Sequence, residues 1–307
     1  MRAFIFPGQG SQFVGMGKAL GEASQVAREL FQEVDEALKQ NLSRLMADGP
    51  IDELTLTENA QPAIMANALA TLRASGIDVR GKAHFVAGHS LGEYTALAAA
   101  GSFDVATAAR LLKQRGRAMQ QAVPVGQGAM AALLGADVEI AQAVADEAAQ
   151  GEICTVANDN DPSQVVISGH RGAIERALEI AKSKGAKRAV LLPVSAPFHS
   201  PLMEPAARAM EQALAEAAIA NPAVPVYANV TAAPVSDAQE IRLLLVEQVT
   251  GMVRWRESVA AMAEAGVTHF VEFGGKVLAP MVKRIAPDAS VTSVVTMDDI
   301  DALVKEI

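Results

Sequence analysis

The chain has 307 residues, of which 50% are hydrophobic and only 4% aromatic, and its formal net charge is −9. This length and apolar content suit one large α/β domain with an inserted subdomain, whose core is built mainly from alanine and aliphatic side chains. The scattered acidic excess argues against a nucleic-acid or membrane-surface binder, and no segment approaches the ~18 uninterrupted apolar residues of a membrane helix.

In the first 125 residues, predicted strands alternate with predicted helices. An apolar strand at the N-terminus runs into the glycine-rich turn PGQGSQ, and a second strand leads through a sharp turn into a helix. Strand, turn and helix in this order are typical of a parallel α/β sheet. A polar stretch, 47–59, separates two helices. The expected strands are residues 2–6 and 84–88, and the expected helices are 22–40, 62–75, 91–100 and 104–122.

The pattern changes at Val125. The next segment has the order β-α-β-β-α-β, which is the ferredoxin-like arrangement. We therefore predict an α/β-hydrolase-like parallel-sheet core, residues 1–125 and 196–307, with an inserted ferredoxin-like subdomain, residues 126–195. The expected strands of the subdomain are 129–134, 153–158, 164–169 and 188–194, and its helices are 137–149 and 171–184.

After residue 195 the α/β pattern resumes. Ser200 is suited to cap the first helix of this part, and Pro201 is suited to begin it. The expected strands are 224–230, 269–273 and 290–295, and the expected helices are 201–218, 237–250, 255–265, 276–285 and 298–306.

Cysteine content and the N-terminus predict the compartment. The single cysteine, Cys154, excludes an intrachain disulfide and suits a reducing cytoplasm. Because Cys154 lies in an apolar run, we interpret it as a buried small hydrophobic residue. The N-terminal apolar stretch is short and broken by Pro7 and Gly8, unlike a signal peptide. A cytoplasmic location is expected.

The segment Gly88-His89-Ser90-Leu91-Gly92 matches G-x-S-x-G, the nucleophile elbow. The serine of such a motif lies in a strained turn between strand and helix, and the glycines allow these two elements to approach. The Ser90 hydroxyl would project at the positive end of the helix, and the Leu91 N–H would face a developing oxyanion. The alternative is a purely structural turn serine, which the strand and helix around the motif disfavour.

A serine nucleophile needs a base, and His199 is the best candidate. It directly precedes a predicted helix, where a positive charge is disfavoured, so its imidazole should stay neutral. His89 should point away from Ser90. Glu204 and Asp237 are available as a third group, but nothing selects either, so a dyad oriented by a backbone or amide group is the alternative. The other histidines, at strand ends, are His84, His170 and His269.

Together these motifs resemble the malonyl-CoA:acyl carrier protein transacylases of fatty-acid synthesis. The matching segments occur in order over nearly the whole chain, which is far more specific than the elbow alone. They are FPGQGSQ (6–12), TENAQPA (57–63), GHSLGEYTAL (88–97), QRGRAMQ (114–120), GAMAALLG (128–135), QVVISG (164–169), SAPFHSPLM (195–203) and VEQV (246–249).

The resemblance implies a role for each site residue. Ser90 would be the nucleophile and His199 its base. Arg115 would bind the free malonyl carboxylate, since its planar fork can make two parallel hydrogen bonds. The backbone amides of Gln9 and Leu91 would form the oxyanion hole. The remaining implied roles are the orientation of His199 by Gln248, an acyl or pantetheine contact by Gln61 and Asn160, and a preference for unbranched malonyl at Phe198.

The resemblance also implies a ping-pong transfer of malonyl from malonyl-CoA to the phosphopantetheine thiol of acyl carrier protein. No metal or redox cofactor is expected, and a monomer is expected. Because that carrier is acidic, a local basic patch is expected, with Lys187, Arg188, Lys283 and Arg284 as candidates. The alternatives are a serine thioesterase or esterase, a discrete acyltransferase of a polyketide synthase, a malonate decarboxylase subunit and a non-catalytic carrier-binding scaffold.

Overall fold

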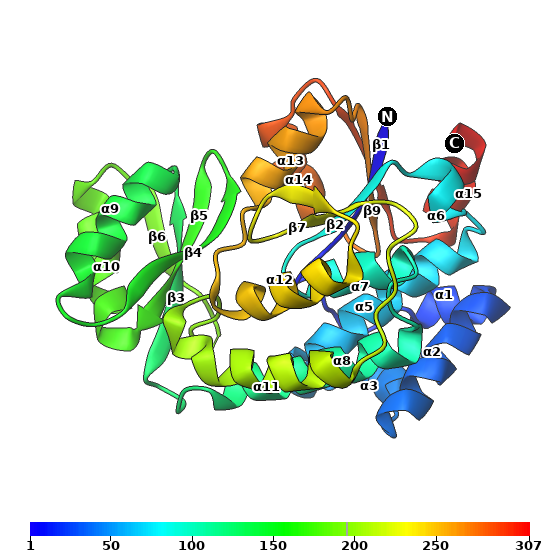
Figure 1. The fold of residues 1–307 in the computed structure, drawn as a ribbon, viewed down its shortest axis with the longest axis horizontal. Helices are drawn as coiled ribbons and strands as arrows, with labels where there is room; N and C mark the ends of the chain where they lie inside the picture. Colours follow the sequence, from blue (N-terminus) through cyan, green and yellow to red (C-terminus); the bar gives the residue numbers. More distant parts are fainter. Residues whose placement is uncertain (195) are drawn as a thin grey trace.

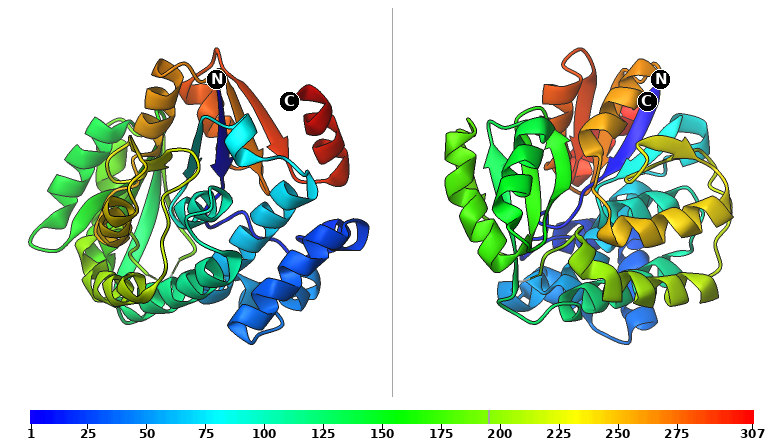
Figure 2. Two further views of the ribbon diagram at one scale, coloured as in Figure 1. Left: turned by 45° about the vertical axis from the view of Figure 1, so that its right-hand side comes forward. Right: turned by 60° about the vertical axis from the view of Figure 1, so that its left-hand side comes forward.

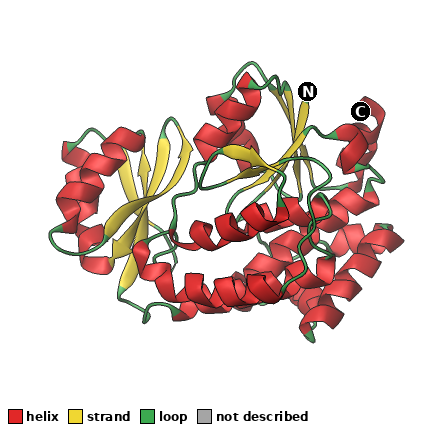
Figure 3. Cartoon of the chain, in the orientation of Figure 1, coloured by secondary structure: helices red, strands yellow, loops and turns green. Residues whose placement is uncertain are grey.

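A computed structural model describes residues 1–194 and 196–307 as two β-sheets with helices packed around them (Figures 1 and 3). Within these residues the larger sheet has six strands in the order β10-β9-β1-β2-β7-β8, and the smaller has four in the order β4-β5-β3-β6. The smaller sheet and its helices form the left-hand part of Figure 1. The α/β class that the sequence predicts is confirmed.

The larger sheet brings two glycine-rich turns to the same edge. Its central strands β1 (Arg2–Phe6) and β2 (Phe85–Gly88) are parallel, and Phe6 is paired with Gly88 where both strands end. Because the carboxyl ends of parallel strands meet at one edge, the turns that follow them lie side by side. The other strands are β7 (Val226–Ala228), β9 (His269–Phe273), β10 (Ser290–Val294) and the antiparallel edge strand β8 (Ala233–Val235).

Two long helices, α5 (Thr57–Ala74) and α8 (Val105–Gln121), cross closely beneath this edge. A Cβ atom at Gly116 would lie 2.5 Å from the Cα of Glu58, so only glycine permits the crossing. The other helices of this part are α1 (Lys18–Ala23), α2 (Gln25–Leu38), α3 (Leu42–Asp48), α4 (Ile51–Thr55), α6 (Val79–Lys82), α7 (Leu91–Ala99), α11 (Glu204–Glu216), α12 (Ala238–Thr250), α13 (Trp255–Glu264), α14 (Leu278–Ile285) and α15 (Met297–Glu306), with a 3-10 turn at Pro201–Met203.

The smaller sheet has the predicted β-α-β-β-α-β order. Helices α9 (Val138–Ala149) and α10 (Arg171–Ser183) cover its outer side with a core of its own, away from the larger sheet (Figure 2). Its strands are β3 (Gly128–Leu134), β4 (Cys154–Asp161), β5 (Gln164–His170) and β6 (Arg188–Leu191), all antiparallel to their neighbours. The proposed subdomain limits, 126–195, remain a prediction.

Several predicted elements differ in the structure. The helix expected over 22–40 is divided between α1 and α2, since Ser24 accepts a hydrogen bond from the Ala27 N–H and starts α2. Ser200 does not cap a helix, because its hydroxyl donates to the Pro197 carbonyl. The polar stretch 47–59 contains α4 and the start of α5. The strands expected to extend to 194 and over 224–230 are shorter, namely β6 and β7.

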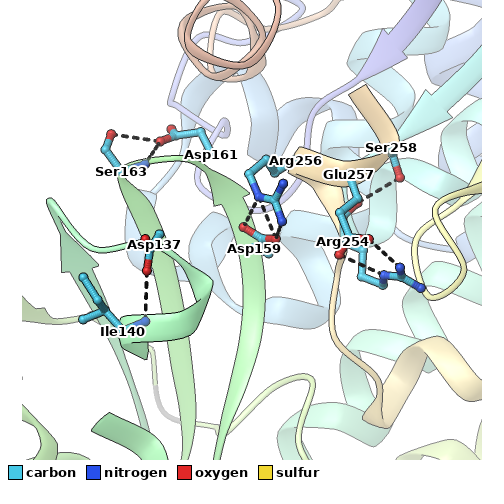
Figure 4. A network of polar contacts seen from close by, with 9 residues as sticks. All are labelled: Asp137, Ile140, Asp159, Asp161, Ser163, Arg254, Arg256, Glu257 and Ser258. Atoms are coloured by element: carbon cyan, nitrogen blue, oxygen red, sulfur yellow. Dashed lines mark hydrogen bonds and ion pairs between the residues drawn. The ribbon is translucent and has the colours of Figure 1, made fainter. Parts of the chain in front are cut away.

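Two carboxylates on β4 anchor the smaller sheet to the rest of the chain. Asp159 accepts from Arg256 of α13 at 2.8 Å, as Figure 4 shows, and Asp161 accepts from Arg284 of α14 at 2.7 Å. Both carboxylate side chains are fully buried. Beside them Val253 forms backbone hydrogen bonds to β4, through Ala157 and Asp159. The ion pairs therefore fix the smaller sheet against α13 and α14, and the Val253 backbone bonds fix it against the segment between α12 and α13.

Removal of Arg256 should destabilise the fold much more than removal of an exposed arginine. In Arg256→Met, the buried Asp159 carboxylate loses its counter-charge, so we expect the free energy of unfolding to fall by about 3–5 kcal/mol. Arg208→Met, which removes exposed ion pairs on α11, should cost less than about 1 kcal/mol. Urea denaturation measures both. Equal losses would show that the Asp159 pair does not anchor the smaller sheet.

Candidate active site

Ser90 lies in a strained turn between β2 and α7, as the motif predicts. Its backbone has φ 54° and ψ −110°, a conformation that side-chain-bearing residues rarely adopt. A Cβ at Gly88 would lie 1.8 Å from the Gly92 carbonyl oxygen, and a Cβ at Gly92 would lie 2.3 Å from that of Phe6. Gly88 is therefore required for β2 and α7 to approach around Ser90, and Gly92 is required for α7 to approach the end of β1.

The structure places His199 against this serine. Its Nε2 lies 2.7 Å from Ser90 Oγ, and its Nδ1 lies 2.9 Å from the carbonyl oxygen of Gln248 and 3.2 Å from that of Gly251. Carbonyl oxygens only accept, so Nδ1 carries the ring proton and Nε2 can accept from the Ser90 hydroxyl. Backbone carbonyl groups thus orient the His199 ring, a role that an acidic side chain has in a catalytic triad.

The acidic candidates for a third group lie elsewhere. Glu204 pairs with Arg208 on the surface of α11, and Asp237 accepts from the Glu240 N–H at the start of α12. Neither contacts His199. Of the alternatives open in the sequence, the structure shows the dyad with backbone orientation.

His199 is neutral for a reason that the sequence did not reveal. Burial lowers its pKa to about 3, with a further lowering by the positive charge of Arg115. The expected cause was the N-terminus of a helix, but a three-residue 3-10 turn separates His199 from α11, which begins at Glu204. Burial beside a cation therefore keeps the imidazole in the form that a general base needs.

The neutral imidazole can be tested by NMR. Since the pKa of His199 lies far below the ordinary value, its ring should show no titration between about pH 5 and 8 and should remain the Nδ1–H tautomer. ¹⁵N-histidine spectra recorded against pH report both, and His199→Asn assigns the signal. A titration midpoint near the ordinary histidine pKa would contradict this account.

Arg115 lies buried next to the nucleophile. Its Nη2 donates to Ser90 Oγ at 3.1 Å and to Gln248 Oε1 at 2.9 Å, and its Nη1 donates to Gln61 Oε1 at 2.8 Å. Its side chain is only 1% exposed, and the guanidinium carbon lies 5.6 Å from the centre of the Tyr94 ring. Arginines on helices usually face solvent, so a buried one needs an anionic or polar partner.

These groups line one cavity of about 280 Å³ between the two sheets. Ser90, His199 and Arg115 meet there, and the smaller sheet contributes a largely apolar wall. A larger hollow of about 520 Å³ beside α5 and α7 has no serine, cysteine or histidine in its lining. The other residues lining the 280 Å³ cavity are Gln9, Gly10, Gln12, Thr55, Gln61, His89, Leu91, Met119, Met130, Asn158, Leu192, Pro193, Val194 and Phe198.

The turn that carries Gln9 lies directly against the elbow. A Cβ at Gly8 would lie 2.7 Å from the His89 carbonyl oxygen, so glycine lets the two turns touch. Within residues 1–194 and 196–307, neither the Gln9 N–H nor the Leu91 N–H donates to a protein acceptor. Both amides are thus available at the cavity, where the resemblance puts an oxyanion hole.

Two predicted contacts, those of Gln248 and Asn160, are made differently. The contact of Gln248 with His199 comes from its backbone carbonyl, while its side chain faces Arg115 and Glu93. Asn160 does not line the cavity; its Oδ1 lies 2.7 Å from Nε2 of His89, which does. Asn158, two residues earlier on β4, takes the place expected of Asn160.

Two residues beneath the elbow received no role from the sequence. Asn229 Oδ1 accepts from the Ser90 N–H at 2.8 Å, and Asn229 Nδ2 donates to the Gly88 carbonyl at 2.7 Å. The buried Glu93 accepts from the Asn229 N–H and from Gln248 Nε2. A signal was present in both segments: a carboxylate in the apolar helix LGEYTALAA, and a polar residue directly after the strand β7.

The candidates for a basic patch are not equivalent. All four are exposed, namely Lys187, Arg188, Lys283 and Arg284, but Arg284 is paired with Asp161. Cys154 is buried, and burial raises the pKa of its thiol to about 11, in keeping with a small hydrophobic residue.

Within the described part of the chain, His, Cys, Asp and Glu form no group that could hold a metal ion. No helix there is long and apolar enough to cross a membrane.

An activated serine with a neutral histidine base is typical of enzymes that form acyl–serine intermediates. The comparison with known families specifies the class. Residues 3–284 match the family model of the acyl transferase domain, and the chain belongs to this family.

Relatives of this chain include several malonyl CoA-acyl carrier protein transacylases. That of Bacillus subtilis (strain 168) is 47% identical over 288 residues, covering 92% of this chain and 90% of the relative. That of Escherichia coli (strain K12) is 44% identical over 284 residues, covering 92% of each chain. The crystal structure of acyl-carrier-protein-S-malonyltransferase from Bartonella henselae is 51% identical with a TM-score of 0.97, covering 99% of this chain and 98% of that one.

A further solved structure shows a relative with its partner. It contains a malonyl-transacylase in complex with the acyl-carrier protein of a type II polyketide synthase. The match has 39% identity and a TM-score of 0.95, and it covers 100% of this chain and 99% of that one. The similarity of these relatives therefore extends over nearly the whole fold, including both sheets.

Proposed function

We propose that this chain transfers the malonyl group of malonyl-CoA to the phosphopantetheine thiol of acyl carrier protein, through an ester on Ser90, and so supplies fatty-acid chain elongation. One observation carries the proposal: the buried Arg115 lies 3.1 Å from Ser90 Oγ in the cavity between the two sheets. A hydrolase of neutral esters has no use for a buried cation there, whereas an acyl group with a free carboxylate does.

The first half-reaction follows from the dyad. His199 Nε2 takes the proton of the Ser90 hydroxyl as Oγ attacks the thioester carbonyl of malonyl-CoA. The oxygen of the tetrahedral intermediate becomes negative and is bound by the N–H groups of Gln9 and Leu91. When the intermediate collapses, the C–S bond breaks, His199 returns its proton to the departing sulfur, and malonyl remains as an ester of Ser90.

Arg115 selects the acyl group in this scheme. Among the described residues its Nε–H has no acceptor, which is expensive in a buried site unless a ligand supplies one. Once Ser90 is acylated, its ester oxygen is a poor acceptor, and the Nη2–H that contacted Oγ is free for the malonyl carboxylate. Gln61 Oε1 holds Nη1, and the aromatic ring of Phe198 lies on the cavity wall, which suits an unbranched malonyl chain.

The second half-reaction repeats the chemistry with a thiol. His199 Nε2 takes the proton of the phosphopantetheine thiol, whose sulfur attacks the Ser90 ester; the C–O bond breaks and Ser90 regains its proton. Coenzyme A must leave before the carrier arm enters, since both use the same cavity, so the kinetics are ping-pong. The apolar wall from Met130, Leu192 and Val194 helps to exclude water from the ester.

The proposal also includes the fold class, the location, the oligomeric state, the cofactors and the partners of the protein. The core is α/β-hydrolase-like, with the ferredoxin-like subdomain 126–195 inserted. The protein is a cytoplasmic monomer that binds malonyl-CoA and acyl carrier protein, and it needs no metal or redox cofactor. A carrier protein of polyketide synthesis is the second candidate acceptor, favoured by the solved complex of a relative with such a carrier.

The proposed transferase can be distinguished from a thioesterase by measuring whether the malonyl group on Ser90 passes to a carrier thiol or to water. The purified protein is incubated with malonyl-CoA, with or without holo-acyl carrier protein from a fatty-acid or a polyketide system. We expect malonyl to appear on a carrier much faster than free malonate is released. Release of malonate as fast as transfer would show a hydrolase, and the preferred carrier would identify the acceptor.

A further inference from the structure

Glu93 is a buried carboxyl group next to the active site that the proposed mechanism does not use. It is the third residue of α7 and is 3% exposed, and its Oε2 accepts from Gln248 Nε2 at 2.8 Å and from the Asn229 N–H at 3.0 Å. A buried carboxyl group carries a large desolvation penalty, so its presence beneath the nucleophile requires a reason.

The Gln248 amide shows what Glu93 does. Its Nε2 donor faces three oxygen acceptors: Glu93 Oε2, the Ser90 carbonyl at 3.0 Å and Asn229 Oδ1 at 3.2 Å. Its Oε1 faces the Arg115 guanidinium at 2.9 Å. If the amide were reversed, its NH₂ group would meet the Arg115 cation, and its oxygen would meet the Ser90 carbonyl, Asn229 Oδ1 and the ionised Glu93 carboxylate, so these contacts would be repulsive.

We propose that Glu93 is a positioning residue: it orients the Gln248 amide, which holds Arg115 beside Ser90, and it thereby sets the preference for an acyl group with a free carboxylate. This inference rests on the proposed function. The contacts form one continuous path from Glu93 Oε2 through Gln248 to Arg115 Nη2 and Ser90 Oγ. The proposed role requires a side chain at position 93 that is long enough to place an acceptor oxygen within hydrogen-bond distance of Gln248 Nε2.

For the orientation of Gln248, the charge of Glu93 is less important than the length of its side chain. Burial raises the pKa of Glu93 to about 7, although the Asn229 N–H, the Gln248 amide and the Arg115 cation all favour ionisation. Near neutral pH the group is thus divided between its protonated and ionised forms, and both present an acceptor oxygen to Gln248. A neutral side chain of the same length should therefore replace it.

Two variants separate reach from charge. Glu93→Gln keeps the length and an acceptor oxygen but loses the charge, whereas Glu93→Asp keeps the charge but is one methylene too short to reach Gln248. The rates of Ser90 acylation by malonyl-CoA and by acetyl-CoA are measured by rapid quench and intact-mass analysis. Glu93→Asp should lower the malonyl-to-acetyl ratio of kcat/KM by about 10-fold, and Glu93→Gln should keep it within about 3-fold of the parent.

The pattern of ratios decides the outcome. A purely structural role would lower malonyl and acetyl acylation equally in Glu93→Asp and leave the ratio unchanged, which would overturn the inference. A ratio lost in Glu93→Gln would also overturn it, because charge would then be required. Failure of the proposed function is distinguishable, since the parent protein itself would then show no preference for malonyl-CoA.

Discussion

Replacement of Ser90 by alanine is expected to lower malonyl transfer by about 10⁴-fold or more. No other side chain in the cavity combines a hydroxyl group with a base at 2.7 Å, as Ser90 does with His199, among the residues that the structure describes. The rate of malonyl transfer to a carrier thiol measures the loss. Ser102→Ala, which removes a buried hydroxyl that does not line the cavity, should keep nearly full activity.

This comparison also tests the dyad itself. If Ser90→Ala retained more than a few per cent of the transfer rate, while Ser102→Ala behaved like the parent, the acyl group would not pass through Ser90. The reaction would then be a direct transfer between the two thiols, and the strained turn at Ser90 would need another explanation.

The second large effect is expected at Arg115. Arg115→Ala removes the only buried cation that contacts Ser90 in the described structure, so malonyl acylation should fall by about 10²-fold or more. Acetyl acylation should fall much less, because an acetyl group has no carboxylate to lose a partner. The kcat/KM values for malonyl-CoA and acetyl-CoA give both changes.

Arg117→Ala is the matched control for Arg115. It lies two positions further along α8, where its side chain is 57% exposed and pairs with Glu58. Its loss should leave the malonyl-to-acetyl ratio unchanged. If Arg115→Ala remained as malonyl-selective as Arg117→Ala, Arg115 would not bind the acyl carboxylate, and another group in the cavity would have to do so.

Much of this site could be predicted because its geometry is local. The close approach of α7 to β2 leaves no room for a Cβ at position 88, and its approach to the end of β1 leaves none at position 92, so the two glycines of G-x-S-x-G indicate the turn at Ser90. Arg115 and His199 lie 25 and 109 residues from Ser90 along the chain, and no spacing rule connects them. The resemblance to a family indicated Arg115, whereas the place of His199 before a predicted helix had already favoured it as the base, and the structure brings both to Ser90.

What the sequence could not show depends on tertiary packing. Glu93 and Asn229 are 136 residues apart and acquire a role only when β7 lies beside β2. The neutrality of His199 comes from burial rather than from its place before a helix. Similarly, α3 and α4 have only one or two turns, which are stable only when packed against neighbours, so their sequences carry weak helical signals.

The most direct test of the account is to identify the acyl-enzyme. The protein is mixed with malonyl-CoA, quenched in acid, and examined by intact-mass and peptide-level mass spectrometry before and after addition of holo-acyl carrier protein. We predict one malonyl adduct, on the peptide that contains Ser90, and its disappearance as malonyl-carrier protein forms. No adduct, an adduct on another residue, or one that the carrier thiol does not remove would contradict the proposed function.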